Sequence, residues 1–500
     1  MPTAPPEAFP FCGPSYPAIS PVLDAQRAIN LYPERGLASS KSQIALIGTP
    51  GLLEWTEMPT SPIRPGGLWA GVGRLFVVAG VNVYEVDSTG AVITDFGAIP
   101  GSTGGAAPVQ MVVGGSNSSN AQLLIMDSSV PGIFLVGASS VTSVFPDAWA
   151  LEYLDSFYLA LGSPGATQNQ VNASDPLDGS TWDPLVFAVK TGTPDLGLNL
   201  VVVNNQIFIA SQKNIEPWYN AGLPNFPFQR IQGSSTTNTG VLAQYSPQKL
   251  DNTWFWLGAS ERGYAQVYKM QGLLPVRISN PAIENLIASY QLNSAGAAQV
   301  TALTYEEPGH LFYMLTFPAT TGNPNGSALV YDVVTNMWHE RYHLNGDTLE
   351  RPLYHCVASI SGFGGETETP VNFAGAWNSG KIYKLGLQYP DDDGDTIRRI
   401  RTAPHVSDAD RWVKHARLTV SAQCGAASML LDYSNDGGRT FDAPVGGPRT
   451  IAPSSEVPSR YTALQLGRSR DRVYRITINS ATELIRLVAA YLDVNMGTEP

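Results

Sequence analysis

The stretch LGLNLVVVNNQIFIAS, residues 196–211, shows the pattern that decides the fold. Two apolar runs rich in β-branched residues flank an Asn-Asn pair, and the second run contains an aromatic residue. β-Branched and aromatic residues favour strands, whereas asparagine favours tight turns. The stretch therefore predicts a β-hairpin.

The same theme recurs along residues 61–404. Each unit has an apolar run, a Gly, Asn or Asp turn, a second run that contains an aromatic residue, and another turn. Units begin near GGLWAGVGRLFVVAG, APVQMVVGGS, WALEYLDSFYLALG, LGLNLVVVNNQIFIAS, VLAQYSPQKLDNTWFWLG, AQVTALTYEEPGHLFYMLTF and PLYHCVASISG. Their spacing of about 40 to 57 residues is close to the roughly 40–50 of propeller repeats. We therefore expect an all-β fold with a β-propeller of about seven blades, and the spacing is compatible with six to eight.

Two segments flank this region. Residues 1–60 are rich in proline and are predicted to form an N-terminal arm, in which GLLEWTEM (residues 51–58) completes the last blade and closes the ring. Residues 405–500 contain short alternating strands such as HARLTVSA and SRYTALQLG, which predict a C-terminal β-sandwich. One helix interrupts the β pattern, with Asn280 as its N-cap and Pro281 at its first position.

Composition and charge narrow the classes of function. The chain has 500 residues, 48 glycines, 38 prolines and few charged residues (14%), as expected for many short strands joined by turns. A net charge of −12 argues against a surface that coats nucleic acid, but it is compatible with a wall past which DNA slides. The three cysteines are far apart and the N-terminus lacks a signal peptide, so we expect assembly in a reducing cytoplasm and no membrane anchor.

The pattern H-E-x-x-H of zinc proteases occurs at residues 339–343. It binds zinc only on a helix, where two histidines four residues apart share a face. The surrounding GSALVYDVVTNMW predicts a hairpin instead, and on a strand His339 and His343 would stand about 13 Å apart at about 3.3 Å per residue. Leu349 also occupies the place of a third ligand. We therefore expect no metal site, no cofactor and no catalytic residue here.

Two further motifs predict turns rather than chemistry. YSNDGGRTF matches an Asp-box, a hairpin turn in which a carboxylate and hydroxyls bind backbone N–H groups, through Ser434, Asp436, Gly438, Thr440 and Phe441. A degenerate copy, SDPLDGSTW, ends at Trp182. The acidic run PDDDGD at residues 390–395 does not have the spacing of a calcium loop and predicts a solvated turn.

Several stretches together resemble one family, the tail-hub or nozzle proteins of short-tailed bacteriophages, also called packaged-DNA stabilisation proteins. They are INLYPE, GTPGL, NIEPWYNAGLPNFPFQRIQG, TWFWLG, RISNPAIENLIASY, GHLFYMLTFP and LVYDVVTNMWHERY. The resemblance implies a non-enzymatic virion protein that forms a ring, a hexamer, below the head-to-tail connector. Such a ring extends the DNA channel, retains packaged DNA and mounts fibres or tailspikes, and DNA passes through it without specific binding.

Two expectations complete this interpretation. A ring that retains DNA needs loops in its channel, and the candidates are NPNGSA within residues 319–328 and the loop at 362–372 with Glu366 and Glu368. The alternative function is a carbohydrate-binding or carbohydrate-cleaving propeller that acts on host surface glycans, since aromatic side chains stack on sugars. A pair of carboxylates about 5–9.5 Å apart would identify it.

Overall fold

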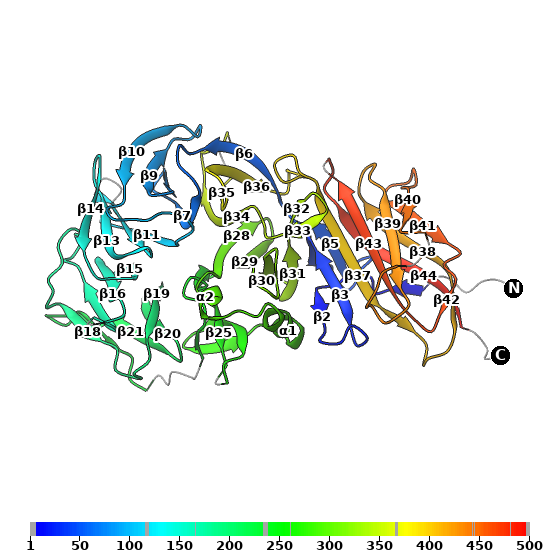
Figure 1. The fold of residues 1–500 in the computed structure, drawn as a ribbon, viewed down its shortest axis with the longest axis horizontal. Helices are drawn as coiled ribbons and strands as arrows, with labels where there is room; N and C mark the ends of the chain where they lie inside the picture. The colour runs from blue at the N-terminus through cyan, green and yellow to red at the C-terminus, as the bar shows by residue number, and fades with distance from the viewer. Residues whose placement is uncertain are drawn as a thin grey trace.

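In the computed structural model, six small antiparallel sheets and four strands of a ten-stranded sheet form a ring of seven blades (Figure 1). The rest of the ten-stranded sheet and a seven-stranded sheet lie beside the ring. The structure describes residues 7–115, 120–165, 167–233, 239–260, 262–365, 369–442, 444, 446–480 and 482–496. The prediction of an all-β propeller with a C-terminal β-sandwich-like domain is confirmed.

The first four blades are consecutive four-stranded meanders. Blade 1 is β7 (Ile63–Gly71), β8 (Arg74–Ala79), β9 (Asn82–Val86) and β10 (Val92–Ala98). Blade 2 is β11 (Val109–Gly114), β12 (Gln122–Asp127), β13 (Val130–Val136) and β14 (Val141–Phe145). Blade 3 is β15 (Ala150–Leu154), β16 (Phe157–Leu161), β17 (Gln170–Ala173) and β18 (Phe187–Val189). Blade 4 is β19 (Gly197–Val203), β20 (Gln206–Ser211), β21 (Ile215–Asn220) and β22 (Phe228–Arg230).

Blades 5 to 7 follow with small variations. Blade 5 is β23 (Gly240–Val241), β24 (Gln248–Leu250), β25 (Thr253–Ala259), β26 (Ala265–Gln271) and β27 (Leu274–Arg277). Blade 6 is β28 (Thr301–Glu307), β29 (His310–Phe317), β30 (Ser327–Asp332) and β31 (Met337–Arg341). Blade 7 is β34 (Tyr354–Ile360), β35 (Val371–Ala376), β36 (Lys381–Gly386) and β6 (Gly51–Glu57). A small hairpin, β32 (His343–Asn345) with β33 (Thr348–Glu350), follows blade 6.

The stretch at residues 196–211 forms the hairpin of β19 and β20. Val203 pairs with Gln206, which leaves Asn204 and Asn205 as a two-residue turn with positive φ angles of 50° and 58°. Asparagine tolerates this left-handed conformation, and such turns match the twist of paired strands. The turn residues therefore set the register of this blade.

The ring closes between the N-terminal and C-terminal parts of the propeller. Leu52 pairs with Leu385, and the register continues to Glu57 opposite Lys381. Leu52 is fully buried, and the Trp55 ring packs against a phenylalanine of β35 with 4.2 Å between ring centroids. Strand β6 therefore joins the two ends of the propeller by backbone hydrogen bonds and apolar contacts.

Helix α1 (Pro281–Ser289) lies outside blade 5, as its sequence predicts. The Asn280 side chain accepts a hydrogen bond from the backbone N–H of Ile283, and Pro281 occupies the first turn. Ile283 and Ile287 are buried in the core between blades 5 and 6. A second short helix, α2 (Ser294–Ala297), follows. No helix among the described residues is long and apolar enough to cross a membrane.

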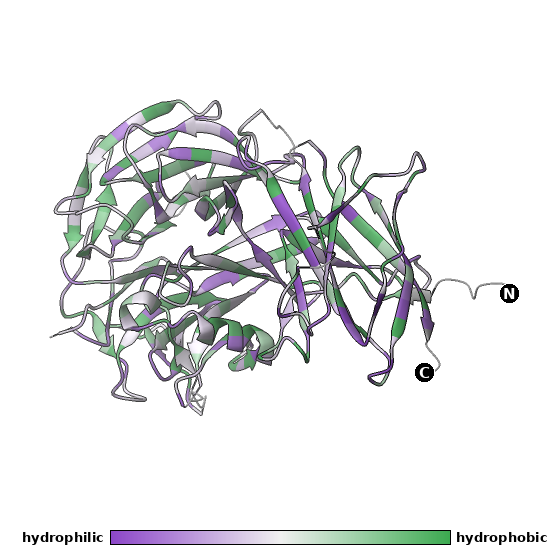
Figure 2. Ribbon diagram, turned by 45° about the vertical axis from the view of Figure 1, so that its right-hand side comes forward, coloured by the Kyte–Doolittle hydropathy of each residue, from purple (hydrophilic) through white to green (hydrophobic). Residues whose placement is uncertain are grey.

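The two larger sheets pack on each other as a sandwich. One contains β4 (Leu31–Arg35), β5 (Ile44–Gly48), β44 (Arg486–Met496), β38 (Val413–Gln423), β41 (Ser459–Leu464), β1 (Glu7–Phe9) and β42 (Arg468–Ser469). The other contains β3 (Ala25–Ile29), β37 (Ile397–Ser407), β43 (Asp471–Ser480), β39 (Met429–Ser434), β40 (Arg449–Ile451) and β2 (Tyr16–Pro17). Hydrophobic segments recur in the strands of both parts (Figure 2).

Strand pairing also shows how the flanking segments contribute. Strands of the first 48 residues pair with C-terminal strands, because Phe11, Ala28, Leu31 and Leu46 fill one core with residues of β38, β39 and β43. Strand β37 extends across residue 404. The second sandwich sheet is continuous with blade 6, since Ile29 of β3 pairs with Glu340 of β31. The domain boundaries at residues 60 and 404 remain predictions from the sequence.

Candidate functional site

The H-E-x-x-H stretch lies at the joint between propeller and sandwich. Residues 337–341 form strand β31, which pairs with β30, so the predicted hairpin is confirmed. His339 and His343 belong to two different strands. His339 is fully buried, and neither of its ring nitrogens has a hydrogen-bond partner among the described residues. Burial lowers the pKa of His339 to about 3, so the imidazole is neutral.

Glu340 fastens the first side of the joint. Its carboxylate is fully buried and accepts a hydrogen bond of 3.0 Å from Nε of Arg27, and it also forms an ion pair with that guanidinium. The Ser15 hydroxyl donates to the same carboxylate at 3.1 Å. The Glu340 carbonyl accepts the backbone N–H of Asn30 at 2.8 Å. A charged residue of blade 6 is thus bound to three residues of the sandwich.

Arg341 fastens the second side. Its guanidinium is buried and forms an ion pair with the buried carboxylate of Asp392, which His343 also approaches at 3.6 Å. Burial alone would raise the pKa of Asp392, but the charge of Arg341 and the hydrogen bonds from His343 and Arg341 together outweigh it, and the pKa lies below its usual value. The prediction of a solvated turn at residues 390–395 is therefore wrong for Asp392. It is wrong because Arg341 supplies a partner that the sequence pattern does not show.

Neighbours of Asp392 bind the ring-closing strand. The Asp391 carbonyl accepts the N–H of Leu52 at 2.8 Å, and the Asp393 N–H donates to the Leu52 carbonyl at 2.9 Å. The Asp393 carboxylate accepts from Lys381 at 3.0 Å. The acidic turn therefore connects blade 7, the closing strand and the joint. No group of three His, Cys, Asp or Glu residues suited to a metal ion occurs in the part of the chain that the structure describes.

Side chains from facing blades fill the axis of the propeller. The inner strands β7, β11, β15, β19, β24, β28 and β34 contact one another around the ring. Across the axis, the Gln110 amide of blade 2 donates to the Asn199 side chain of blade 4 at 3.1 Å. Lys249 of blade 5 forms an ion pair of 2.8 Å with Glu152 of blade 3. The remaining cavity, lined by residues of every blade, has a volume of about 230 Å³. The axis is therefore a packed core and not an open channel.

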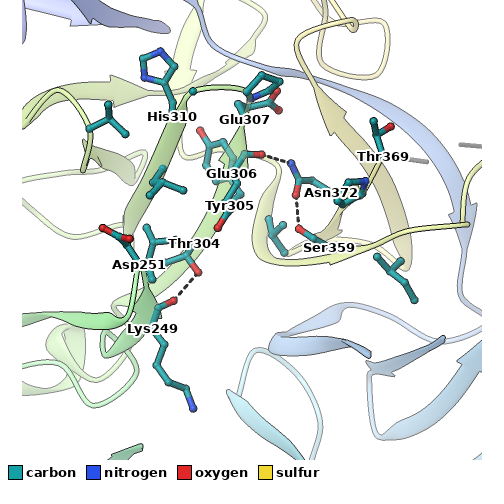
Figure 3. A pocket seen from close by; sticks show the side chains of 18 of the residues that line it. Lys249, Asp251, Thr304, Tyr305, Glu306, Glu307, His310, Ser359, Thr369 and Asn372 are labelled. Carbon is teal, nitrogen blue, oxygen red and sulfur yellow. Dashed lines mark hydrogen bonds between the residues drawn. The ribbon is translucent and has the colours of Figure 1, made fainter. Parts of the chain in front are cut away.

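A larger pocket of about 1030 Å³ opens where blades 5, 6 and 7 meet (Figure 3). Its walls come from the turn after β24, the turn between β28 and β29, and the region between β34 and β35. The Asn372 amide donates to the Glu306 carbonyl at 2.8 Å, and Ser359 donates to Asn372 (Figure 3). The pocket is thus bounded by hydrogen bonds between blades 6 and 7.

Glu307 is the unusual titratable group of this pocket. Its Oε1 atom is buried and has no hydrogen-bond partner among the described residues. Burial raises the pKa of Glu307 to about 7, although the backbone N–H of Leu387 and nearby His310 oppose the shift. Adjacent side chains on a strand point to opposite faces, so the carboxylates of Glu306 and Glu307 diverge. These two residues do not form the converging carboxylate pair that a glycosidase needs.

Both Asp-box-like motifs form closed turns. Asp436 accepts from the backbone N–H groups of Arg439 (3.1 Å) and Thr440 (3.0 Å), and Ser434 accepts from the N–H of Gly438 at 2.8 Å. The Phe441 ring lies 4.1 Å from the guanidinium carbon of Arg475.

In the second motif Asp178 accepts from Ser180 and Thr181, and the Trp182 ring packs against Phe145 with centroids 5.0 Å apart. Hydrogen bonds from Ser180 lower the pKa of Asp178 to about 2. In both turns the aspartate accepts hydrogen bonds from within the turn, and the terminal aromatic ring packs against another side chain of the protein.

The two candidate channel loops have different outcomes. Glu366 and Glu368 lie outside the described residues, so that loop stays a prediction. The turn at residues 319–328 is described and packs against the end of α1, where the Thr320 hydroxyl donates to the carbonyl of Tyr290. A Cβ atom on Gly322 would lie 2.0 Å from the carbonyl oxygen of Ser289. This turn is therefore packed against the helix. A loop that projects freely into a channel would not make such contacts.

Sequence reasoning missed the residues of the joint. Arg27 is 313 positions from Glu340 in sequence, and Arg341 is 51 positions from Asp392. The only signal was the presence of charged residues inside otherwise apolar strand patterns, since a buried charge requires a partner. That signal indicates that a partner exists but not which residue it is.

Comparisons with solved structures give weak similarities. The chain is similar to the computationally designed Ika8 protein (TM-score 0.37, 10% identity, 67% of this chain and 99% of that chain). It is similar to the N-terminal domain of Nup159 (TM-score 0.39, 11% identity, 72% and 98%). It is also similar to exo-β-1,3-galactanase from Phanerochaete chrysosporium (TM-score 0.30, 10% identity, 89% and 100%). These scores carry no argument about function. A search among curated proteins found no match.

A protein-family profile gives the assignment. The profile, described as "Bacteriophage P22 Gp10, beta-propeller", matches residues 25–338, which is more than half of the chain. The match begins in β3 of the sandwich and runs through blades 1 to 6 as far as the tryptophan before His339. The resemblance to packaged-DNA stabilisation proteins is thereby confirmed. The chain belongs to this phage stabilisation family, and it is a bacteriophage structural protein that stabilises packaged DNA.

Proposed function

We propose that the chain is a subunit of the phage tail hub, or nozzle, and that six copies form a ring below the head-to-tail connector. This ring extends the DNA channel, retains the packaged genome and provides a mounting surface for fibres or tailspikes. The subunit assembles in the host cytoplasm, acts in the virion and catalyses no reaction. Its partners are other copies of itself, the connector and the fibre proteins.

The packed propeller axis is the observation that carries this proposal. A cavity of about 230 Å³, crossed by the Lys249–Glu152 ion pair, cannot admit a DNA duplex. The major groove of a duplex alone is about 12 Å wide. A single copy therefore offers no passage for DNA, and a conduit requires several copies around a common axis.

The charge of the chain supports a conduit that does not hold DNA. Residues 75–189 contain ten acidic residues and no lysine or arginine. Three of the acids (Glu85, Asp127 and Glu152) are buried in ion pairs with residues outside this range, and the other seven are not. Acidic surfaces repel phosphate and form no salt-dependent contacts with it. DNA that passes such a surface is confined by shape and not by adhesion.

A genetic experiment tests the proposal. Phage particles are assembled without the chain, and the nuclease sensitivity of their genome is compared with that of complete particles. The proposal predicts filled heads whose DNA leaks and becomes nuclease-sensitive, with restoration when the purified chain is added. Particles that lack the chain and still retain protected DNA at the same level would refute it.

One observation favours a second candidate function. The pocket between blades 5, 6 and 7 is large, and it contains Glu307 with a raised pKa, as a general acid requires. A glycan-cleaving propeller would use Glu307 together with a carboxylate other than Glu306, and Asp251 also lines this pocket. Host surface polysaccharide is incubated with the chain and with its Glu307→Gln variant, and reducing ends are measured. Release by the wild type that the variant loses would support this candidate, and no release by either would remove it.

A further inference from the structure

The two ends of the molecule differ in charge. Residues 397–500 contain 14 basic and 10 acidic side chains, whereas residues 75–189 contain ten acidic and no basic ones. In Figure 1, β18 of blade 3 and β42 of the sandwich lie at opposite ends of the long axis. Of the acidic side chains, Glu85, Asp127 and Glu152 are buried and paired with basic residues outside this range, which leaves seven acidic ones without such a partner. Of the basic side chains, Arg399, Arg401 and Arg472 are buried. Each copy therefore has an acidic propeller end and a sandwich end with a small basic excess.

The basic end has an aromatic centre. The Trp412 side chain is 42% exposed, and the guanidinium carbons of Arg468 and Arg470 lie 4.9 and 5.4 Å from its ring centroid. Lys414 stands directly opposite Arg468 on the antiparallel pair of β38 and β42. Like charges placed opposite each other on a sheet are destabilising. An acidic partner surface would relieve this repulsion, and Trp and Arg are the residues that most often anchor interfaces.

The acidic end has an apolar centre. Strand β18 pairs on one edge only, with β17, among the strands that the structure describes. Its inner face contributes Ala188 to the core between blades 3 and 4, while Phe187 and Val189 on the other face are 38% and 44% exposed. Leu185, just before the strand, is 82% exposed. A free strand edge with exposed apolar side chains is typical of an interaction surface.

Acidic residues surround this apolar centre. The loop that leads into β18 contains Asp175 and Asp183, and both are exposed. Asp155, on the turn between β15 and β16, is also exposed. An apolar centre with an acidic rim thus stands at one end of the molecule. At the other end stands an aromatic centre beside Lys414 and Arg468, with Arg470 paired to the exposed Asp410 at 3.3 Å.

We infer that these two ends bind each other between neighbouring copies, with the Trp412 surface of one copy on the β18 surface of the next. The inference rests on the proposed ring, because a heterologous contact that repeats by rotation closes into a ring. A second copy is the partner that the charges favour, since both complementary surfaces exist on this chain. Attraction between opposite charges orients the copies before the apolar centres meet.

Charge exchange between two variants tests the inference. The first variant, Arg468→Glu with Arg470→Glu, reverses the basic end, and the second, Asp175→Lys with Asp183→Lys, reverses the acidic end. Self-association of the full chain is measured by light scattering and sedimentation velocity. Each variant alone places like charges in contact, so we expect association at least about tenfold weaker than that of the wild type.

The decisive measurement uses a mixture of the two variants. One contact in the mixture then joins two unmodified surfaces, and the alternate contact joins two surfaces whose charges are both exchanged. Association is expected to return in the mixture. Arg460→Glu is the matched control, because Arg460 pairs with Ser421 near the opposite end of β38 from Lys414. Its association is expected to equal that of the wild type.

Each result decides the inference. Wild-type association that weakens as salt rises supports it without any variant. Variants that associate as strongly as the wild type would overturn the pairing and leave the ring in place. A wild-type chain that does not self-associate would overturn the pairing. The proposed function would then be tested on its own by the genome-retention experiment with phage particles. If Arg468→Glu with Arg470→Glu alone binds DNA less than the wild type and association is unchanged, the basic end contacts DNA and the pairing is wrong.

Discussion

The contact between blades 3 and 4 and the joint between propeller and sandwich are built from different chemistry. Leu159, Leu161, Leu200, Ile207 and Ile209 form an apolar core between the two blades. The joint contains the buried charges of Glu340, Arg341 and Asp392. Apolar packing stabilises without direction, whereas a buried ion pair is favourable only in one geometry. The blades therefore supply stability, and the joint fixes how the sandwich stands on the ring.

The largest effect is expected from breaking the joint. Asp392→Ala leaves the Arg341 guanidinium buried without its ion-pair partner, and removal of one member of a buried pair costs about 3–5 kcal/mol. Urea unfolding measures the loss, and limited proteolysis near residues 387–396 is expected to accelerate. Glu456→Ala, which removes an exposed partner of Arg460, is the control and costs at most about 1 kcal/mol. Equal losses in both variants would show that the joint is not held by this pair.

A substitution that creates a cavity in the core between blades 3 and 4 tests the other region of the comparison. Leu159 is fully buried, and Leu→Ala substitutions in such cores cost about 2–5 kcal/mol. Leu159→Ala is expected to lower stability without accelerating proteolysis at the joint. A joint-specific proteolysis signal in this variant would contradict the division of roles between the two regions.

The stability of the fold is expected to depend on pH in opposite directions at the pocket between blades 5, 6 and 7 and at the joint. The folded state raises the pKa of Glu307 from 4.5 to about 7, so it keeps a proton that the unfolded chain releases. Stability from this group is therefore complete below about pH 4.5 and is lost as pH rises through 7, by up to about 3 kcal/mol. Asp392 has the opposite sign, because its lowered pKa stabilises the folded state until acid protonates it. The free energy of unfolding is expected to fall between about pH 6.5 and 8 in the wild type, above the range in which buried His339 contributes, and to become nearly independent of pH there in Glu307→Gln. An unchanged fall in the variant would assign it to another group.

The smallest effect is expected at the Asp-box-like turn. Asp436→Ala removes hydrogen bonds to the backbone N–H groups of Arg439 and Thr440 at an exposed turn, where water replaces them. The expected loss is no more than about 1 kcal/mol, with assembly unchanged. A loss of association in light scattering would give this turn a role in an interface.

Local chemistry explains which features the sequence predicts. The Asn204–Asn205 turn, the Asn280 cap and the hairpin of β30 and β31 depend on neighbouring residues, so their patterns are visible in sequence. The partners of Arg27 and Asp392 depend on contacts between residues far apart in the chain. The same is true of the packed axis, where Gln110 meets Asn199 across the ring. Periodicity gives the blades, but it does not say which polar side chains meet.

The mass of the assembled protein tests most directly whether DNA passes between copies. The purified full chain is mixed with connector rings, and the mass of the complex is measured by light scattering. Several copies per connector ring are expected, because the propeller axis of one copy is closed to a duplex. The proposed ring has six. A chain that remains monomeric when connector rings are present, or that binds as one copy, would contradict the ring.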